Sequence, residues 1–285
     1  MFKSRHQLQK DFAYVQSLFC FTFPARWGII SSTTRTKEVI PLIKAVAFDF
    51  DQTLYDRDRT LELMAPEFMS HFADKLRDGV TLEQVVAATK HADRAGFELP
   101  DRPARRSDSI KMPWGSTYRS LVATGIFSDV PTHEEYYYGF ILPAFPKYID
   151  MYPDAVSTLI KLREMGYTTG LLTNGTSEFQ NAKLDYVGLR RHIDRVILCG
   201  DLEYQKPHVS TFEAICEAMG CAPGEALYVG DNPVNDVEGA RRAGMVPVWM
   251  RSVGLWFDAL EPSPYAIDAI GELPELIKKI NGGIM

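Results

Sequence analysis

Two aspartates, Asp49 and Asp51, stand two residues apart at the end of an apolar run of the sequence. The stretch reads AVAFDFDQTLYD over residues 45–56, so both carboxylates directly follow a segment typical of a buried strand. Like charges this close repel each other and cost stability, so packing alone does not explain the pair. We therefore expect either a cation beside these carboxylates or a reaction that uses them.

Other residues capable of chemistry follow later apolar runs in the same way. Three small polar or flexible residues end the run at 167–175. A lysine lies shortly after the run at 195–201, and two more aspartates follow near the end of the run at 226–232. In chain order these candidates are Thr173, Asn174, Gly175, Lys206, Asp231 and Asp236. Ligands of open α/β sheets collect beyond the carboxyl ends of the strands, so we expect these side chains to share one site.

The elements that must position these residues alternate along the chain. Near-continuous apolar runs predict strands buried on both faces, which is typical of a parallel sheet. They cover residues 45–51, 167–175, 195–201, 226–232 and 246–252. Amphipathic stretches between them, at 153–166, 208–220 and 235–244, predict helices. Strand and helix in alternation predict a doubly wound α/β fold.

One long segment breaks this alternation. Residues 57–149 carry helical patterns and no comparable strand, so we expect an all-α insertion there, placed between the first strand and the rest of the sheet. The predicted domains are then an N-terminal extension (1–43), an α/β core (44–56 and 150–285) and the helical insertion (57–149).

Taken together, the motifs resemble those of the haloacid dehalogenase-like hydrolase superfamily. They are DFDQT (49–53), a strand ending in LLTNG, a Lys-Pro pair at 206–207, and GDNPVND (230–236). Each is common by chance, but all four in order, each near a strand end, form a specific pattern. The resemblance covers residues 44 to 255, and the helical insertion matches the cap placed after the first motif in one branch of the family.

The resemblance implies a role for each motif residue. Asp49 is the expected nucleophile, which forms an aspartyl-phosphate, and Asp51 the expected general acid and then base. Thr173, with the backbone N–H groups of Asn174 and Gly175, is expected to hold the phosphoryl oxygens, and Lys206 to neutralise charge. The implied ligands of a metal are the Asp49 carboxylate, the Asp51 main-chain carbonyl, Asp231 and Asp236. Crowding among these acids is expected to raise the pKa of Asp51 toward the working pH.

Charge balance makes Mg²⁺ the expected cofactor. Four aspartates offset only by Lys206 would repel a phosphate dianion, whereas a divalent cation leaves the site near neutrality. Mg²⁺ is a hard cation that suits oxygen ligands. The expected function is therefore Mg²⁺-dependent hydrolysis of a small phosphomonoester, such as a sugar phosphate, a nucleotide or a phosphoglycolate-like compound.

Several alternatives stay open at this point. A phosphomutase or a phosphonate hydrolase of the same superfamily would share these motifs, and a non-catalytic binding module could retain the fold. A 2-haloacid dehalogenase is disfavoured because that reaction needs neither Asp51 nor a metal. Four basic residues of the insertion could grip an anionic substrate, although a solvated loop is the plainer interpretation. They are Arg102, Arg105, Arg106 and Lys111.

Composition narrows the partners and the compartment. A net charge of −6 and a pI near 5.6 argue against a general nucleic-acid binder. No apolar window reaches the roughly 20 residues that span a bilayer, so no membrane partner is expected. The four cysteines, Cys20, Cys199, Cys216 and Cys221, form no CxxC pair and are expected to be reduced thiols in a cytoplasmic protein. The oligomeric state is not readable from the sequence.

Overall fold

The computed structural model describes residues 42–97, 112–251, 256–257 and 260–282. Six strands form one sheet in the order β5-β4-β1-β6-β7-β8, and every neighbouring pair is parallel. The strands are β1 (Ala45–Phe48), β4 (Thr168–Thr173), β5 (Arg195–Leu198), β6 (Ala226–Gly230), β7 (Val246–Met250) and β8 (Tyr265–Ile267). The predicted parallel sheet is confirmed, and β8 is a sixth strand that the apolar runs did not indicate.

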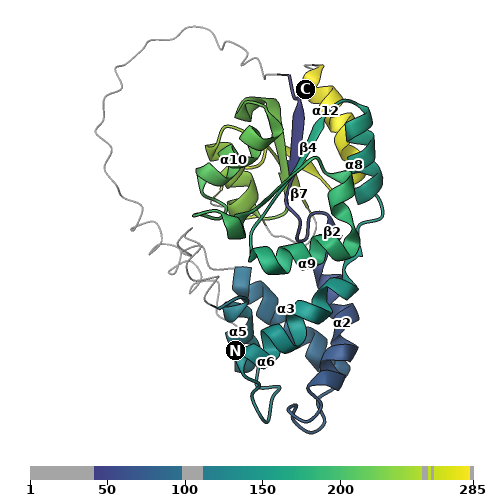
Figure 1. The fold of residues 1–285 in the computed structure, drawn as a ribbon, viewed down its shortest axis with the longest axis vertical. Helices are drawn as coiled ribbons and strands as arrows, with labels where there is room; N and C mark the ends of the chain where they lie inside the picture. Colours follow the sequence, from purple (N-terminus) through teal and green to yellow (C-terminus); the bar gives the residue numbers. More distant parts are fainter. Residues whose placement is uncertain (1–41, 98–111, 252–255, 258–259, 283–285) are drawn as a thin grey trace, which may run out of the picture. The chain divides into compact units, whose positions relative to one another are not determined.

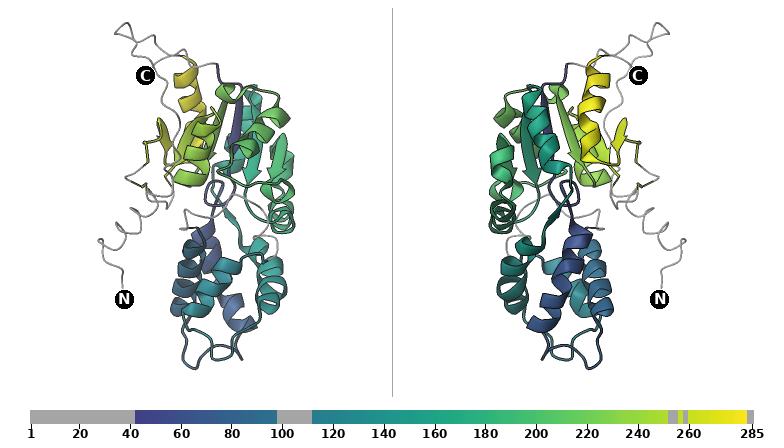
Figure 2. Two further views of the ribbon diagram at one scale, coloured as in Figure 1. Left: turned by 90° about the vertical axis from the view of Figure 1, so that its left-hand side faces the viewer. Right: turned by 90° about the vertical axis from the view of Figure 1, so that its right-hand side faces the viewer.

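Helices cover both faces of this sheet, as Figures 1 and 2 show. They are α8 (Ala155–Glu164), α9 (Ser177–Val187), α10 (Val209–Met219), α11 (Gly239–Arg242) and α12 (Leu273–Asn281). Short 3₁₀ turns lie at η3 (Leu189–His192), η4 (Cys199–Asp201), η5 (Pro223–Glu225) and η7 (Ile270–Glu272), and a π-helical turn, η6 (Pro233–Glu238), leads into α11. The doubly wound α/β architecture is therefore confirmed.

Strand β1 shows why its sequence is apolar throughout. All four residues, AVAF, are buried, and successive side chains point to opposite faces. Val46 and Phe48 belong to the apolar cluster that includes α8 and α12, whereas Ala45 and Ala47 belong to the cluster that includes α10. Two-sided burial leaves no place for a polar residue until the strand ends, which puts Asp49 at its carboxyl end.

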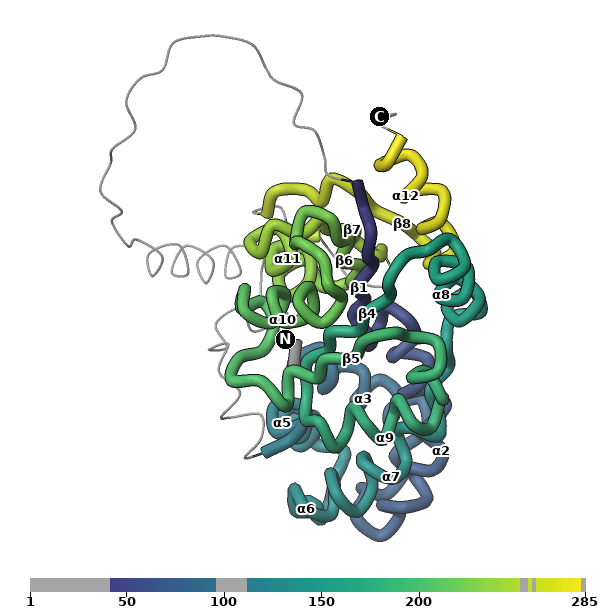
Figure 3. Tube along the Cα trace, turned by 45° about the horizontal axis from the view of Figure 1, so that its top comes forward, coloured from purple at the N-terminus to yellow at the C-terminus, as the bar shows by residue number. Residues whose placement is uncertain are grey.

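The described part of residues 57–149 consists of helices and turns with one isolated bridge, between Leu76 and Phe127. Its helices are α2 (Arg57–His71), α3 (Leu82–Phe97), α5 (Gly115–Ala123), α6 (His133–Tyr136), η1 (Tyr137–Ile141), α7 (Leu142–Ala144) and η2 (Phe145–Tyr148). Figure 3 follows the chain from β1 into this helical insert and back toward α8. The described residues of this segment agree with the predicted all-α insertion, and residues 98–111 lie outside the described ranges.

A short antiparallel ribbon marks the two ends of the helical insert. Strand β2 (Tyr55–Asp56) pairs with β3 (Asp150–Met151), so the outgoing and returning chains lie side by side. Asp56 also begins α2, because its carboxylate accepts a hydrogen bond from the backbone N–H of Arg59 at 2.8 Å. The division of the chain into an extension, a core and a cap stays a prediction. Across the described ranges, no helix has both the length and the apolar character needed to cross a membrane.

Candidate active site

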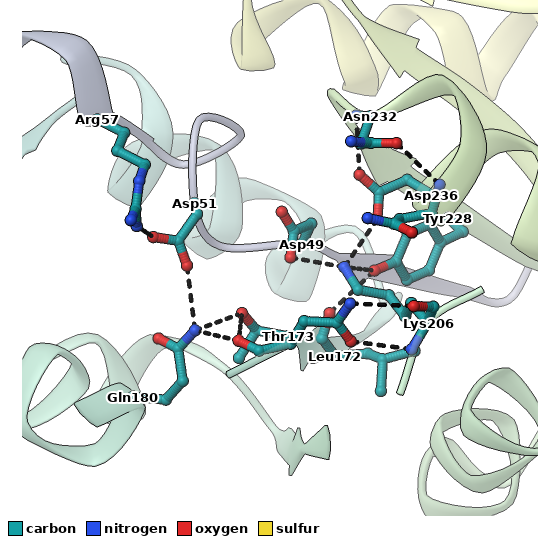
Figure 4. A network of polar contacts seen from close by, with 12 residues as sticks. Asp49, Asp51, Arg57, Leu172, Thr173, Gln180, Lys206, Tyr228, Asn232 and Asp236 are labelled. Carbon is teal, nitrogen blue, oxygen red and sulfur yellow. Dashed lines mark hydrogen bonds and ion pairs between the residues drawn. The ribbon is translucent and has the colours of Figure 1, made fainter. Parts of the chain in front are cut away.

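Three of the predicted aspartates meet at the carboxyl ends of the central strands. Asp49 follows β1, Asp231 follows β6, and Asp236 lies in η6. One carboxylate oxygen from each lies within 4.8 Å of the others, which is a spacing that a single metal ion could bridge. We call these three residues the acid cluster; Figure 4 shows two of them, Asp49 and Asp236.

A buried lysine joins the acid cluster. The Lys206 ammonium lies 2.7 Å from Asp49 Oδ1 and 2.7 Å from Asp236 Oδ1, and the residue is only 3% exposed. It also donates to the Tyr228 hydroxyl at 2.9 Å, which in turn donates to the backbone carbonyl of Leu172 at 2.9 Å. The Lys206 side chain is thereby fixed between two acids (Figure 4).

The turn after β6 is built for close approach of Asp236. A Cβ added to Gly230 would lie 2.4 Å from Asp236 Cγ, so only glycine fits at this point. The backbone N–H of Asn232 donates to Asp236 Oδ2 at 2.9 Å. The Asn232 side chain accepts from the backbone N–H groups of Val234 and Asn235, which begins η6 and fixes the direction of the turn.

Asn174 connects the end of β4 to the lysine loop. Its side chain accepts from the Lys206 backbone N–H at 2.9 Å and donates to the Lys206 carbonyl at 3.1 Å. This pair of bonds gives the Asn174 side chain a positioning task that the motif alone did not indicate. Gly175 follows with φ 113°, a conformation that favours glycine, and Thr173 is 1% exposed at the strand end.

Asp51 stands apart from the acid cluster and has cationic partners of its own. Lys183 Nζ lies 2.7 Å from each of its carboxylate oxygens, and Gln180 Nε2 donates to Oδ2 at 3.1 Å. The Tyr55 hydroxyl and the Arg57 guanidinium both donate to Oδ1. Gln180 Nε2 also donates to the Thr173 hydroxyl at 3.1 Å, so one amide links the two motifs (Figure 4).

These contacts contradict the expected pKa of Asp51. Burial alone would raise it, but the charges of Lys183 and Arg57 outweigh burial and hold the pKa well below the ordinary value of 3.8. The expectation of a raised pKa was wrong because it counted only the neighbouring acids. Burial lowers the pKa of Lys183 to about 8, which leaves this ammonium charged at neutral pH.

Asp49 and Asp231 show the opposite behaviour. Burial, opposed by Lys206 and reinforced by the neighbouring acids, raises the pKa of Asp49 from 3.8 to about 7. Burial and the charges of Asp236 and Asp49 likewise raise the pKa of Asp231 well above its ordinary value. The acid cluster therefore has too little positive charge to keep all its carboxylates ionised by itself.

Arg57 brings the helical insert to Asp51. Its guanidinium binds Asp93 of α3 through two bonds, Nε to Oδ2 at 2.8 Å and Nη2 to Oδ1 at 2.7 Å, and directs Nη1 at Asp51. The guanidinium carbon also lies 4.9 Å from the Trp114 ring centroid and 5.2 Å from that of Phe145. Arg57 is 7% exposed, so the contact between insert and sheet is made inside the protein.

Sequence reasoning missed Tyr228 and Asn232 beside the acid cluster. It also missed five residues on the Asp51 side of the site, which are Tyr55, Arg57, Asp93, Gln180 and Lys183. A signal existed for the last two, because Gln180 and Lys183 lie three residues apart on the same buried face of α9 as Phe179 and Leu184. Polar residues on a core-facing stripe indicate a buried partner. The basic residues Arg102, Arg105, Arg106 and Lys111 lie outside the described residues.

Comparison with known proteins agrees with the geometry. The family model for haloacid dehalogenase-like hydrolases matches residues 43–244. The glyceraldehyde 3-phosphate phosphatase of Methanopyrus kandleri is 28% identical over 247 residues, which are 84% of this chain and 99% of the relative. The phosphoserine phosphatase of Thermus thermophilus is 40% identical over 126 residues, 44% of this chain and 49% of the relative.

Solved structures extend the likeness to three dimensions. The HAD phosphatase of Thermococcus onnurineus superposes with a TM-score of 0.58 at 27% identity, covering 82% of this chain and 98% of that one. The L-2-haloacid dehalogenase of Xanthobacter autotrophicus, at 20% identity and a TM-score of 0.63 over 83% of this chain and 98% of that one, shares the fold. This chain therefore belongs to the haloacid dehalogenase-like hydrolase family and to its phosphatase branch.

Proposed function

We propose that the chain is an Mg²⁺-dependent phosphatase that hydrolyses a small phosphomonoester through an aspartyl-phosphate on Asp49. The observation that carries the proposal is the acid cluster with its buried lysine: three carboxylates within 4.8 Å, joined by Lys206 at 2.7 Å from two of them. Carboxylate oxygens are the ligands that Mg²⁺ prefers. The phosphatase names of its relatives support the same reaction.

The charges around the acid cluster fit a divalent cation. Asp51 is balanced by Lys183, and Asp93 by Arg57, so neither pair adds a net charge. The acid cluster and Lys206 alone then carry two negative charges, which one Mg²⁺ would neutralise before a phosphate dianion enters. This count replaces the sequence-based one, in which Asp51 was treated as an unbalanced charge.

The residues that would hold Mg²⁺ are Asp49, Asp231 and Asp236, together with the main-chain carbonyl of Asp51. A bound Mg²⁺ supplies Lewis-acid stabilisation of the charge on the phosphoryl oxygens. Because Lys206 holds Oδ1 of Asp49, we assign the attack on phosphorus to Oδ2. The new Oδ2–P bond forms as the bond from phosphorus to the alcohol oxygen breaks, with Lys206 compensating negative charge.

Thr173, Asn174 and Gly175 form the proposed cradle for the phosphoryl oxygens. The Thr173 hydroxyl and the backbone N–H groups of the two following residues lie at the carboxyl end of β4, next to the end of β1. The contacts of the Asn174 side chain with Lys206 hold this turn against the lysine loop. The proposed phosphoryl cradle and the ammonium of Lys206 are thus positioned together.

Asp51 is proposed to exchange the protons of the reaction. Lys183 and Arg57 hold its carboxylate ionised, which is the form that can take a proton from the water that attacks the aspartyl-phosphate in the second half-reaction, although the same contacts make it a weaker base. To protonate the leaving alcohol in the first half, Asp51 must first bind a proton and loosen these contacts. Arg57 belongs to the helical insert, so we infer that a movement of the insert, acting as a cap, accompanies that step.

The substrate is proposed to be a small phosphorylated metabolite of the cytoplasm. Relatives act on glyceraldehyde 3-phosphate, phosphoserine and, at 32% identity over 39% of this chain, N-acylneuraminate 9-phosphate. The net charge of −6 disfavours a nucleic-acid partner, and free thiols suit a reducing compartment.

A substrate panel tests the proposal. Phosphate release from sugar phosphates, nucleotides, phosphoserine and phosphoglycolate is measured with Mg²⁺ and with a chelator, for the wild type and for Asp49→Asn. We expect turnover of at least one compound that needs both Mg²⁺ and Asp49. Asp268→Asn, at an exposed carboxylate paired with Arg251, is the matched control and should leave turnover unchanged. Equal turnover in excess chelator, or full activity of Asp49→Asn, would contradict the proposal.

A further inference from the structure

Helix α10 ends in a complete Schellman motif. Gly220 adopts the left-handed conformation at φ 71°, its backbone N–H donates to Glu217 O at 3.0 Å, and the backbone N–H of Cys221 donates to Cys216 O at 3.1 Å. In this motif the residue that follows the glycine packs on the residue five positions before it, usually through apolar side chains. Here both positions are cysteines.

The motif brings these two thiols together. Cys221 Sγ lies 3.9 Å from the carbonyl oxygen of Cys216, so the Cys221 side chain turns back toward the residue that carries the other thiol. A direct backbone hydrogen bond of 3.1 Å joins the same two residues and holds them close together, and a disulfide needs such proximity. We propose that Cys216 and Cys221 form a reversible disulfide under oxidising conditions, and that this bridge fastens the end of α10.

The proposed reaction uses a hydroperoxide as the oxidant. Cys221 is half-buried and Cys216 is buried, so the Cys221 sulfur is the one that a peroxide reaches first. Its thiolate takes one peroxide oxygen and becomes a sulfenic acid, while the other oxygen leaves as an alcohol or as water. The Cys216 sulfur then attacks the Cys221 sulfur and water leaves. Two thiols and one hydroperoxide give one disulfide, one alcohol or water, and one further water.

Burial sets the rate of this reaction. It raises the pKa of Cys216 to about 12 and also raises that of Cys221, so little of either thiol is ionised at neutral pH. The bridge should therefore form slowly, under sustained oxidation. Cys199 is buried as well, with its pKa raised to about 12, and lies at the end of β5.

The bridge lies at the end of α10 remote from the lysine loop. The helix begins at Val209, three residues after Lys206, and the two cysteines lie at and beyond its last turn. A disulfide there constrains the link between α10 and β6 in the unfolded chain. We therefore expect a higher melting temperature, by roughly 4–9 °C before any strain in the bridge is subtracted, with an unchanged catalytic site.

Peptide mapping of the full chain provides the test. The protein is treated with hydrogen peroxide, its remaining thiols are alkylated, and a glutamyl endopeptidase is used because it cuts at Glu217, between the two cysteines. The expected product joins the peptide ending at Glu217 to the one containing Cys221, and dithiothreitol separates them. The same treatment should leave the hydrolysis of p-nitrophenyl phosphate within about twofold of the untreated rate.

Matched variants complete the experiment. Cys199→Ser and Cys20→Ser should keep both the linked peptide and the rise in melting temperature, whereas Cys216→Ser and Cys221→Ser should lose both. Bridges that contain Cys199 or Cys20, or a Cys221 that is oxidised to the sulfinic acid without a bridge, would overturn the inference. A mapped Cys216–Cys221 bridge without a rise in melting temperature would refute its stabilising role. Mapping of the wild type needs no variant to fold and no active enzyme.

Discussion

Replacing Asp49 with asparagine should stabilise the metal-free protein, although it removes the proposed nucleophile. Asp49 is 7% exposed, and its pKa rises from 3.8 to about 7 because burial disfavours its charge. Asparagine keeps the shape and an oxygen that can accept from Lys206, but it carries no charge. The ammonium of Lys206 retains its partner Asp236 at 2.7 Å, so the substitution leaves no unpaired buried cation.

The sign and size follow from proton linkage. A carboxyl whose pKa is raised on folding contributes its full stability below pH 3.8 and loses it progressively up to about pH 7. Above that pH the loss amounts to about 4 kcal/mol at most, because each tenfold change in proton affinity corresponds to about 1.4 kcal/mol. The variant lacks this loss. The free energy of unfolding of the variant, relative to that of the wild type, should therefore increase by about 3 kcal/mol between about pH 5 and about pH 8.

Urea unfolding, followed by tryptophan fluorescence in excess chelator at the two pH values, measures this difference. Mg²⁺ should reverse the order at about pH 8, because only the wild type keeps the full set of ligands and gains the free energy of metal binding. Asp268→Asn is the control. Because Arg251 lowers the pKa of this exposed carboxyl, the change in free energy of unfolding caused by Asp268→Asn should not vary with pH over the same range. If the stability difference between Asp49→Asn and the wild type does not increase with pH, burial does not raise the pKa of Asp49 as proposed.

Three further perturbations follow from the site. Lys183→Met should lower the free energy of unfolding by about 3 kcal/mol, because it leaves the partly buried Asp51 with Arg57 as its cationic partner; an effect below about 1 kcal/mol in urea unfolding would contradict this. Asp93→Asn should lower kcat about tenfold with a smaller change in KM, because Arg57 loses the partner that directs it at Asp51; steady-state kinetics with an unchanged kcat would refute that link. The apparent Mg²⁺ affinity should be about tenfold weaker at about pH 6 than at about pH 8, since protons compete for Asp49; calorimetry showing equal affinities would count against Asp49 as a ligand.

The motif residues could be predicted because their positions depend on local sequence. A buried strand such as β1 tolerates only apolar residues, so the first polar residue after it marks the carboxyl edge of the sheet. Parallel strands bring these edges together, which is why Asp49, Asp231 and Lys206 could be assigned to one site without knowing the strand order. The β8 strand was missed because three residues, YAI, give no periodic signal of their own.

The partners of Asp51 could not be predicted in the same way. Arg57 and Asp93 meet through the packing of α2 on α3, which are separated by a turn of the helical insert and carry no motif. Lys183 comes from α9, where its place on the core-facing side indicates a buried partner but does not identify that partner as Asp51. Tertiary packing therefore decided the one electrostatic property, the pKa of Asp51, on which the prediction was wrong.

The two aspartates of the first motif differ because their partners differ, although they are two residues apart. Asp49 shares one ammonium with Asp236 and keeps a raised pKa, whereas Asp51 is surrounded by an ammonium, a guanidinium and a phenol and keeps a lowered one. Environments that separate the pKa values of neighbouring acids also separate their roles. In the proposed reaction, Asp49 needs a metal to become fully ionised and attack phosphorus, whereas Asp51 needs its cationic partners to move before it can donate a proton. Metal binding and movement of the helical insert would thus act on different aspartates in the same half-reaction, in which the aspartyl-phosphate forms and the alcohol leaves.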